Sequence, residues 1–295
     1  MPASVTQRVN VGFFQQNISL NKYTTWNIGG PASYFCEPSS ISELREGLSF
    51  ARQRNLDWVV IGNGSNILAP DNGFSGLVIR IGPKFSRVLT DDGVITVQSG
   101  APLCKLADIA NDYDCSCFNF TTGIPGTVGG AVAMNAGAFG YEVGDFLTRV
   151  VYVTQEGELK EIKNLGKSFT YRTSPFQDSS KIVLSAQLDL DFSADQPGMS
   201  EILSIRRNKM PYSAPSAGSV FKNPAHTKKT AGEMLDIVGA KGMRVGDAAV
   251  SHRHANFIVN KGHATAENVR NLIDILLERV YKEFGVTLVT EIKVI

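Results

Sequence analysis

The chain has 295 residues, of which 43% are hydrophobic, and this suffices for about two compact domains with buried cores. The formal net charge of +1 provides no strong field for nucleic acid or an anionic membrane, so we expect neither as a partner. No stretch approaches the ~18 apolar residues of a membrane helix, and residues 1–20 lack the apolar block of a signal peptide. We therefore expect a cytoplasmic protein without membrane insertion.

Helices and strands alternate irregularly in the first half of the chain. Ser40 and Glu43 have the spacing of a capping box, in which each side chain satisfies a free backbone N–H of the other residue. This box should begin a helix, because Leu44, Leu48 and Ala51 then share one face. The other elements expected here are strands at 58–61, 77–80 and 94–98 and a helix at 103–110.

A long amphipathic helix is predicted near the end of the second half. Residues 266–284 carry apolar side chains at helical spacing, and Gly285 is a typical C-terminal stop. A shorter helix should begin at Ser200 and end near Pro211, after a polar segment, 191–199, that we interpret as a domain boundary. Further strands are expected at 150–154 and 182–190. Because strands and helices are mixed without strict βαβ alternation, the predicted fold class is α+β.

The cysteines predict no disulfide framework. They are Cys36, Cys104, Cys115 and Cys117. The last two lie one residue apart, a spacing that suits neither a structural disulfide nor a zinc site. We expect all four to be reduced thiols, as is usual in a cytoplasmic protein.

Two glycine-rich segments indicate a binding site. Residues 62–66 read GNGSN after an expected strand, and residues 123–137 include the run GIPGTVGG. The first segment is not a Rossmann fingerprint, since no third glycine follows Gly64 at the required spacing and Pro70 prevents the necessary helix. Closely spaced N–H groups beside small side chains still let a backbone approach a pyrophosphate, so we expect both segments to bind one. The alternative is that both are only tight turns.

Six segments, in order, resemble the UDP-N-acetylenolpyruvoylglucosamine reductase family of the vanillyl-alcohol-oxidase-like flavoproteins. IGNGSNIL at 61–68 and GIPGTVGGAVAMNAGAFG at 123–140 look like that family's FAD-binding loops. The other four are TTWNIGGPA at 24–32, FTYRTSPF at 169–176, AGSVFKNP at 217–224 and VSHRHANFIVN at 250–260. Since they cover nearly the whole chain, it is identified as a member. The short interval between Arg172 and Ser219 resembles the subtype that lacks a substrate-covering tyrosine loop.

The resemblance implies a two-lobed FAD-binding domain of the vanillyl-alcohol-oxidase/PCMH type and a C-terminal α+β substrate-binding domain. The expected lobes are 1–80 and 81–195, and the expected substrate domain is 196–295, whose last strand would return to the active site. The resemblance also implies noncovalent FAD, NADPH as co-substrate, and a UDP-sugar whose enolpyruvyl group is reduced to form UDP-N-acetylmuramate in peptidoglycan precursor synthesis. We expect a monomer.

The same resemblance assigns three catalytic roles. Ser219 matches the proton donor to C2 of the substrate, and Arg172 matches the residue whose planar donor fork grips the substrate carboxylate. Glu291 matches the acid that hydrogen-bonds the same carboxylate. Because an ionised Glu291 would repel that group, its pKa should be raised by burial. Without the resemblance, each residue would more simply belong to a turn or to the surface.

Binding roles follow in the same way. The residues that match cofactor-binding positions are Gly62, Asn63, Gly64, Ser65, Asn66, Gly123, Ile124, Pro125, Gly126, Val128, Gly129, Gly130, Asn135, Ala136 and Gly137. The residues expected to bind substrate are Tyr171, Lys209, Asn223 and His254. His252 and His254 share a strand face, but no third ligand is evident, so we expect no metal site.

Two alternative functions differ in what they require. Another FAD-linked oxidoreductase of the same superfamily would carry both glycine-rich segments but not AGSVFKNP or the Tyr-Arg pair. A non-catalytic nucleotide-sugar-binding protein would be favoured if Ser219, Arg172 or Glu291 were replaced. All of these features are present, so the sequence favours the reductase.

Overall fold

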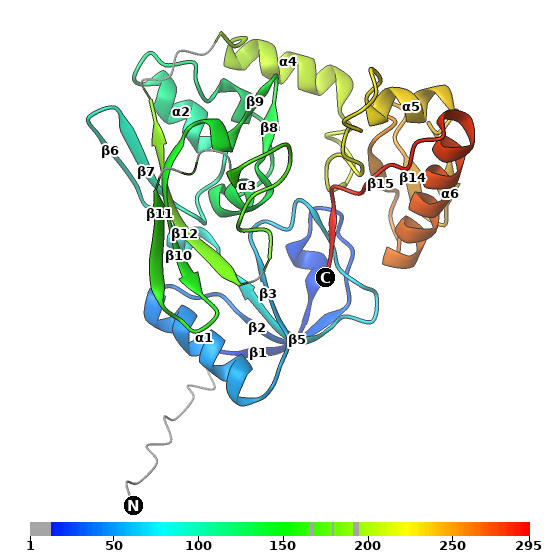
Figure 1. Ribbon diagram of the computed structural model, residues 1–295. Coiled ribbons are helices and arrows are strands. Elements are labelled where there is room, and N and C mark those ends of the chain that lie inside the picture. The colour runs from blue at the N-terminus through cyan, green and yellow to red at the C-terminus, as the bar shows by residue number, and fades with distance from the viewer. Residues whose placement is uncertain (1–12, 164, 166–167, 179, 191–194) are drawn as a thin grey trace, which may run out of the picture.

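A computed structural model describes residues 13–295 except 164, 166–167, 179 and 191–194. Most of the N-terminal segment tested for a signal peptide, and residues 191–194 of the expected domain boundary, therefore lie outside the described residues. Figure 1 shows a mixed sheet at the bottom, an antiparallel sheet at the upper left and a helical lobe at the right. Within the described residues, no helix is long and apolar enough to cross a membrane.

The sheet at the bottom of Figure 1 is partly parallel. Its elements are the strands β1 (Gln15–Ser19), β2 (Pro31–Cys36), β3 (Trp58–Ile61) and β5 (Phe74–Arg80) and the helix α1 (Ile41–Gln53). The strand order is β1-β2-β5-β3; β2, β5 and β3 run parallel, and β1 runs antiparallel to β2. Parallel strands need a crossover connection, and α1 provides it between β2 and β3.

Helix α1 forms where the sequence predicts it, but its cap differs in part. Ser40 accepts a hydrogen bond from the N–H of Glu43 at 3.2 Å, as expected. The carboxylate of Glu43 instead accepts from the N–H and the hydroxyl of Ser39. Only half of the predicted capping box is therefore present, because Ser39 offers two donors closer to the carboxylate. Leu44 and Leu48 are buried against the sheet as predicted.

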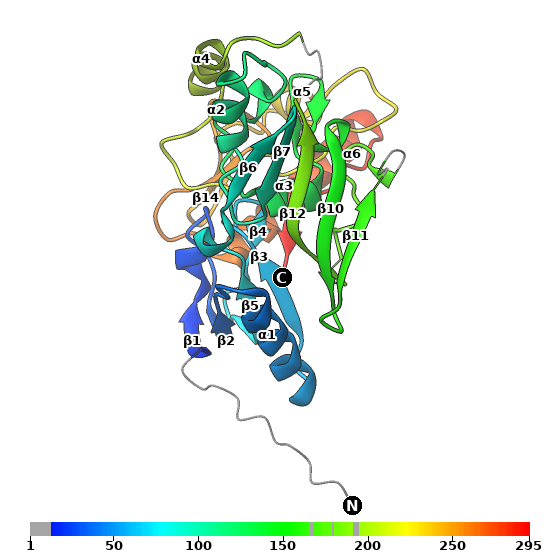
Figure 2. The same cartoon turned by 90° about the vertical axis from the view of Figure 1, so that its left-hand side faces the viewer.

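The second sheet is antiparallel throughout and is seen face-on in Figure 2. Its strands are β6 (Val88–Asp91), β7 (Val94–Gln98), β10 (Leu147–Thr154), β11 (Leu159–Lys163) and β12 (Lys181–Asp189), in the order β11-β10-β12-β7-β6. The helices α2 (Lys105–Asn111) and α3 (Val128–Met134) cover one face. Phe118, Phe120 and Phe146 lie in the core between helices and sheet.

Helix α3 begins inside the second glycine-rich segment, where the sequence predicted only a loop. Thr127 caps it by accepting a hydrogen bond from the N–H of Gly130, and Asn135 ends it in the left-handed conformation at φ 46°. Threonine is a preferred N-cap, and asparagine tolerates the left-handed region, so both ends have local causes. Beyond it lie the short strands β8 (Gly137–Ala138) and β9 (Tyr141–Glu142).

The right-hand lobe consists of short strands between helices. It contains α5 (Ala231–Ile237), β13 (Arg244–Val245), β14 (Ala248–Val250), β15 (Ile258–Asn260) and α6 (Ala266–Phe284). Helix α4 (Met199–Lys209) precedes this lobe, lies at the top of Figure 1 and contacts the turn Asn119–Thr121 of the second lobe. The predicted apolar stripe of α6 is buried, and Gly285 ends the helix at φ 65°. Helix α4 begins after Gly198 rather than at Ser200.

The end of the chain returns to the first lobe, where it forms a separate two-stranded sheet. Strand β16 (Lys293–Val294) pairs in parallel with β4 (Ile67–Leu68), directly after the first glycine-rich segment. Trp26 also connects the first lobe to the right-hand lobe, since its indole N–H donates to the carbonyl of Ile258. Single turns of 3-10 helix occur at Leu20–Tyr23, Pro83–Phe85, Asn119–Thr121 and Val143–Asp145. The expected domain boundaries stay predictions.

The cysteines correct one expectation. Cys115 and Cys117 form a disulfide, where the sequence favoured reduced thiols. The chain reverses here, with Asp114 in the left-handed region at φ 53°, and the two Cα atoms lie 5.5 Å apart, which a disulfide can bridge. Cys36 is a buried free thiol, and burial raises its pKa to about 12.

Candidate active site

A cleft of about 980 Å³ lies among the three lobes. It is lined by residues 62–66 after β3, residues 123–127 before α3, residues 210–219 after α4 and the last residues of the chain. Arg172, Ser219 and Glu291, the three predicted catalytic residues, all line it. The structure thus brings them to the same cleft as the two glycine-rich segments.

The two glycine-rich segments pack against each other. A side chain at Gly62 would overlap the hydroxyl of Thr127, and one at Gly129 would lie 2.6 Å from the Cβ of Ser99. These two glycines are therefore required by the protein's own packing. At Gly126 a Cβ would lie 3.4 Å from the hydroxyl oxygen of Ser65, which is an ordinary contact. Gly126 lines the cleft without such a constraint, so a change there reports on a bound ligand.

The backbones of these segments differ in what they offer a ligand. Within the described part of the chain, the N–H groups of residues 62–66 donate no hydrogen bond to the protein. In the second segment, the N–H groups of Gly126, Gly129 and Gly130 already donate to neighbouring oxygens. The N–H donors expected from both segments are therefore free mainly in the first. Because unsatisfied backbone donors are costly when covered, a ligand over 62–66 should accept from them.

Asn66 has a second role that the sequence did not indicate. Its side-chain N–H donates to the carbonyl of Glu291 at 3.0 Å, and its own carbonyl accepts from the N–H of Lys293 at 2.9 Å. These contacts hold the end of the chain against the first glycine-rich segment. The position of Glu291 in the cleft depends on them.

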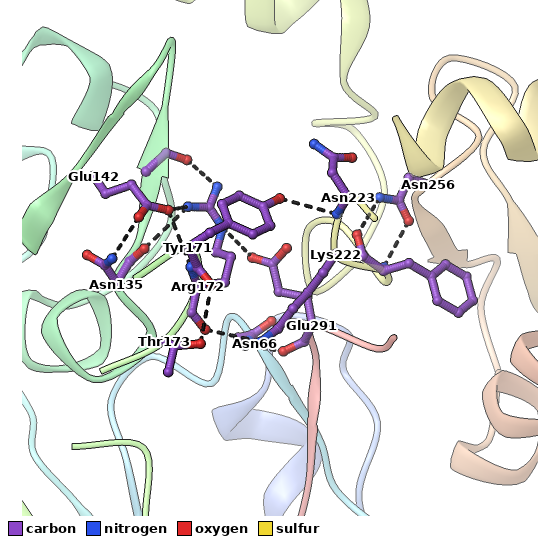
Figure 3. Close-up of polar contacts among 12 residues, drawn as sticks. Asn66, Asn135, Glu142, Tyr171, Arg172, Thr173, Lys222, Asn223, Asn256 and Glu291 are labelled. Atoms are coloured by element: carbon purple, nitrogen blue, oxygen red, sulfur yellow. Dashed lines mark hydrogen bonds and ion pairs between the residues drawn. The ribbon is translucent and has the colours of Figure 1, made fainter. Parts of the chain in front are cut away.

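Arg172 is the centre of a polar network (Figure 3). Its backbone is left-handed at φ 52°, which is uncommon for arginine, and its side chain is 15% exposed. Nε donates to Glu291 at 3.0 Å, Nη1 to Glu142 at 2.6 Å and to the carbonyl of Asn135 at 3.3 Å, and Nη2 to the carbonyl of Gly137 at 2.6 Å. Of the five N–H groups of a guanidinium, these contacts leave one, on Nη2. The fork is therefore largely occupied by the protein itself.

Burial raises the pKa of both carboxyl groups beside Arg172. Burial raises the pKa of Glu291 above its usual value, while the positive charges of Arg172 and Lys222 oppose that shift. Burial also raises the pKa of Glu142, again against the effect of Arg172. The direction for Glu291 confirms the expectation from sequence. Glu142 was not predicted as a site residue.

Ser219 lies in a turn that is tied to the chain end. Gly218 before it has φ 74°, a left-handed conformation that favours glycine. The carbonyl of Val220 accepts a hydrogen bond from the N–H of Glu291 at 2.8 Å, and Phe221 and Thr290 form a β-bridge. Ser219 and Glu291 thus lie on adjoining backbone segments, although 72 residues separate them in the sequence.

The four predicted substrate-binding residues are not among the residues that line the cleft. Tyr171 is 45% exposed, and its hydroxyl accepts from the backbone N–H of Asn223 at 3.2 Å (Figure 3). Lys209 is the last residue of α4. His254 is half-buried, and burial, followed by the charge of Lys241, lowers its pKa. No group of three or more His, Cys, Asp or Glu residues among those described could hold a metal ion.

Two predicted cofactor residues are also absent from the lining. Val128 and Asn135 are both buried in the protein. The side-chain N–H groups of Asn135 donate to the carboxylate of Glu142 at 2.7 Å and to the carbonyl of Thr170 at 2.9 Å. Asn135 therefore orients protein groups next to the cleft. The other thirteen predicted cofactor residues line the cleft.

Arg206 is a cleft residue that sequence reasoning missed. It is 5% exposed, and no carboxylate pairs with it within the described residues. Its Nη2 donates to the carbonyl of Phe120, but its Nε has no partner in the described chain. Burial accordingly lowers its pKa. Arg206 follows the buried Ile202 by four residues, so it lies on the inward face of the predicted helix. That spacing could have indicated a buried cation from the sequence.

Two family models match the chain. One, described as the C-terminal domain of UDP-N-acetylenolpyruvoylglucosamine reductase, matches residues 210–295. The other, described as an FAD binding domain, matches residues 32–163. Together they contain both glycine-rich segments and two of the three predicted catalytic residues, Ser219 and Glu291.

Similar proteins align over nearly the whole chain. UDP-N-acetylenolpyruvoylglucosamine reductase of Desulforamulus reducens is 39% identical, with 99% of this chain and 97% of that protein aligned. The protein of the same name from Anoxybacillus flavithermus is 37% identical, over 98% and 96%. The crystal structure of UDP-N-acetylenolpyruvylglucosamine reductase from Thermus caldophilus superposes with a TM-score of 0.77 at 34% identity, covering 96% of this chain and 99% of that one. The predicted fold, a PCMH-type FAD-binding domain with a C-terminal α+β domain, is confirmed.

Proposed function

Because the chain belongs to the UDP-N-acetylenolpyruvoylglucosamine reductase family, and is therefore an FAD-dependent oxidoreductase, we propose that it reduces the enolpyruvyl group of UDP-N-acetylglucosamine enolpyruvate with NADPH to form UDP-N-acetylmuramate. We place this reaction in peptidoglycan precursor synthesis and the protein in the cytoplasm, as a monomer. The observation that carries the proposal is the convergence of Ser219, Arg172 and Glu291 on the cleft that the glycine-rich segments also line.

The residues present fit FAD. The free N–H groups of 62–66 suit its pyrophosphate, Gly126 allows close approach, and the buried Arg206 lacks an anion that a phosphate would supply. When bound, FAD supplies the hydride-transfer chemistry between NADPH and C3 of the enolpyruvyl group. The protein's part is to bind, to orient and to move a proton.

Ser219 is the proposed proton donor to C2 of the substrate. A serine hydroxyl is a weak acid, so it protonates only a strongly basic acceptor that is held close to it. The carbon adjacent to the carboxylate becomes such an acceptor after hydride has reached C3. The turn at Gly218 and the backbone bond from Glu291 to Val220 hold Ser219 at the cleft wall.

Arg172 and Glu291 are proposed to bind the carboxylate of the substrate. The occupied fork of Arg172 leaves one N–H on Nη2, so a two-pronged grip by Arg172 alone would require it to release a protein contact. A protonated Glu291 supplies a second donor beside it. Together they would stabilise the negative charge that the carboxylate gains as hydride arrives.

Half-reactions of the purified protein test the proposal. The protein should be yellow, and heat or acid should release free FAD into the supernatant. Anaerobic NADPH should bleach the flavin, and UDP-N-acetylglucosamine enolpyruvate should then restore the colour. A colourless protein that takes up no FAD, or a reduced flavin that only dioxygen reoxidises, would contradict the proposed activity.

Steady-state kinetics tests whether one cleft serves both substrates. NADPH and the UDP-sugar must reach the same flavin. The UDP-sugar should therefore bind only after NADP⁺ has left, and NADPH only after the UDP-sugar product has left. We expect ping-pong kinetics, with inhibition by the UDP-sugar at high concentration. Intersecting double-reciprocal lines, together with a complex that holds both ligands, would oppose a shared site.

A further inference from the structure

Arg172 has two carboxylate neighbours, and the substrate would bring a third. Glu142 and Glu291 both accept hydrogen bonds from its guanidinium (Figure 3). With both ionised, this group of three residues has a net charge of −1. A substrate carboxylate would then be repelled in a partly buried site, where charges are weakly screened. Lys222, the other cation beside Glu291, offsets part of this charge, and protonation of one of the two glutamates removes the remaining repulsion.

Glu142 is surrounded by donors. Its Oε1 accepts from Nη1 of Arg172 at 2.6 Å and from the backbone N–H of Arg172 at 3.4 Å, and its Oε2 accepts from Asn135 at 2.7 Å. Its carboxylate also accepts from the backbone N–H of Asp145, in a capping box that includes the charged side chain of Asp145. Burial and the charge of Asp145 raise the pKa of Glu142, but a protonated carboxyl would have to give up one of these contacts. The geometry therefore favours the ionised form at Glu142 more than at Glu291.

Glu291 has a different environment. Its Oε1 accepts from Nε of Arg172, and within the described residues its Oε2 accepts no hydrogen bond. The charged groups around it are Arg172, Lys222 and Glu142. Burial and the negative charge of Glu142 favour its neutral form, while the two cations oppose it. Its free Oε2 is therefore the place in this network where a proton can reside.

We propose that Glu142 is a positioning residue that holds Arg172 as its permanent counter-ion, and so leaves Glu291 to carry a proton toward the carboxylate of the substrate. The inference rests on the proposed function. It extends that function by assigning the charge of each glutamate and a role for Glu142. Glu142 acts through Arg172 and need not touch the substrate.

Carbon-13 NMR of glutamate-labelled, FAD-containing protein tests this assignment without turnover. We expect a carboxyl signal that titrates above the usual range and disappears in Glu291→Gln. In Glu142→Gln the signal should move down by about 1 pH unit or more, because Arg172 then has only Glu291 as counter-ion. The proposal is overturned if the high-titrating signal disappears in Glu142→Gln and persists in Glu291→Gln.

Stopped-flow reoxidation by the enolpyruvyl substrate provides the second readout. Its rate needs protonated Glu291, so it should be high at low pH and fall as pH rises through the pKa of Glu291. In Glu142→Gln the rate should begin to fall about 1 pH unit lower. At a pH above the pKa of Glu291 in both proteins, the variant should therefore be reoxidised about tenfold more slowly than the wild type. Flavin reduction by NADPH should be unchanged. Asp145→Asn, an amide replacement at the other end of the capping box, is the matched control. It should not change the pH at which the reoxidation rate falls.

A double variant separates positioning from mere structural support. The amide introduced by Glu291→Gln cannot ionise, so in that background the change Glu142→Gln should not slow reoxidation further. Loss of the same factor in both backgrounds would show that Glu142 only supports the fold, and would overturn the proposal. If the wild-type flavin is not reoxidised by the substrate at all, the proposed function fails, and the NMR titration still decides which glutamate holds the proton.

Discussion

The cleft is made of two unlike regions. The glycine-rich wall, residues 62–66, 123–127, 129 and 130, presents backbone atoms that are shaped by turns and by contacts between the two segments. The polar cluster of Arg172, Ser219 and Glu291 presents side chains from three distant parts of the chain. Its members are held by long-range contacts, such as that between Lys222 and the carbonyl of Arg172. The backbone conformation of each glycine-rich segment is therefore set locally, whereas the contact between the two segments and the polar cluster both depend on the assembled lobes.

The two regions should differ in which half-reactions they affect. The glycine-rich wall is expected to retain the cofactor, and the polar cluster is expected to serve only the step that consumes the UDP-sugar. Variants of the glycine-rich wall should therefore impair both half-reactions through loss of FAD, whereas variants of the polar cluster should slow only reoxidation by the UDP-sugar.

The largest effect is expected at Ser219. Ser219→Ala should slow reoxidation by the enolpyruvyl substrate by about 10²-fold or more, the usual size of a lost general acid. Flavin reduction by NADPH should remain nearly normal. Ser219→Cys should retain more activity than alanine, because a thiol can donate a proton from a similar position. Equal slowing of both half-reactions in stopped-flow absorbance would mean that Ser219 positions a shared part of the cleft.

Arg206 tests whether the cleft needs a buried cation. Arg206→Met should stabilise the cofactor-free protein, since it removes a buried charge that has no carboxylate partner among the described residues. It should also weaken the binding of the anionic ligand that contacts Arg206 by about 1.5–3 kcal/mol. FAD retention, and KM for NADPH and for the UDP-sugar, identify that ligand. Unchanged values for all three would leave Arg206 with only a packing role.

Gly126 tests the glycine-rich wall itself. Gly126→Val should weaken FAD binding by about 1–3 kcal/mol, the usual cost of added bulk in a packed site. The apo-protein should keep its stability, because a Cβ there meets only Ser65 at 3.4 Å. Gly198→Val, where a Cβ meets nothing within 4 Å, is the control. Fluorescence titration of apo-protein with FAD measures the difference, and equal affinities would refute close approach at Gly126.

The smallest effect is expected at Asn66. This residue lies in the glycine-rich wall, but its side chain contacts the backbone of Glu291 in the polar cluster. Asn66→Ala removes the hydrogen bond to the carbonyl of Glu291, worth about 0.5–1.5 kcal/mol. We expect reoxidation by the substrate to slow a few-fold while FAD affinity changes little. A loss of FAD affinity with an unchanged rate of reoxidation would instead show that the Asn66 side chain binds the cofactor.

The sequence predicted elements whose cause is local. The apolar stripe and the terminal Gly285 of α6 were visible as spacing, and Ser40 marked the start of α1. Helix α3 was missed because glycines are poor helix formers and conceal the cap at Thr127. The disulfide of Cys115 and Cys117 was missed because it depends on the turn between α2 and the next segment.

The candidate site divides along the same line. From sequence, the resemblance identified Ser219, Arg172 and nearly all the glycine-rich wall, since these lie in short recognisable motifs, and it identified Glu291 by its place near the end of the chain. Glu142 and Arg206 lie in no such motif that indicated a role. Their importance arises from what surrounds them: a second carboxylate on an occupied guanidinium, and a buried cation with no carboxylate partner among the described residues. Burial and pairing depend on segments far apart in the chain, so only the tertiary structure could decide them.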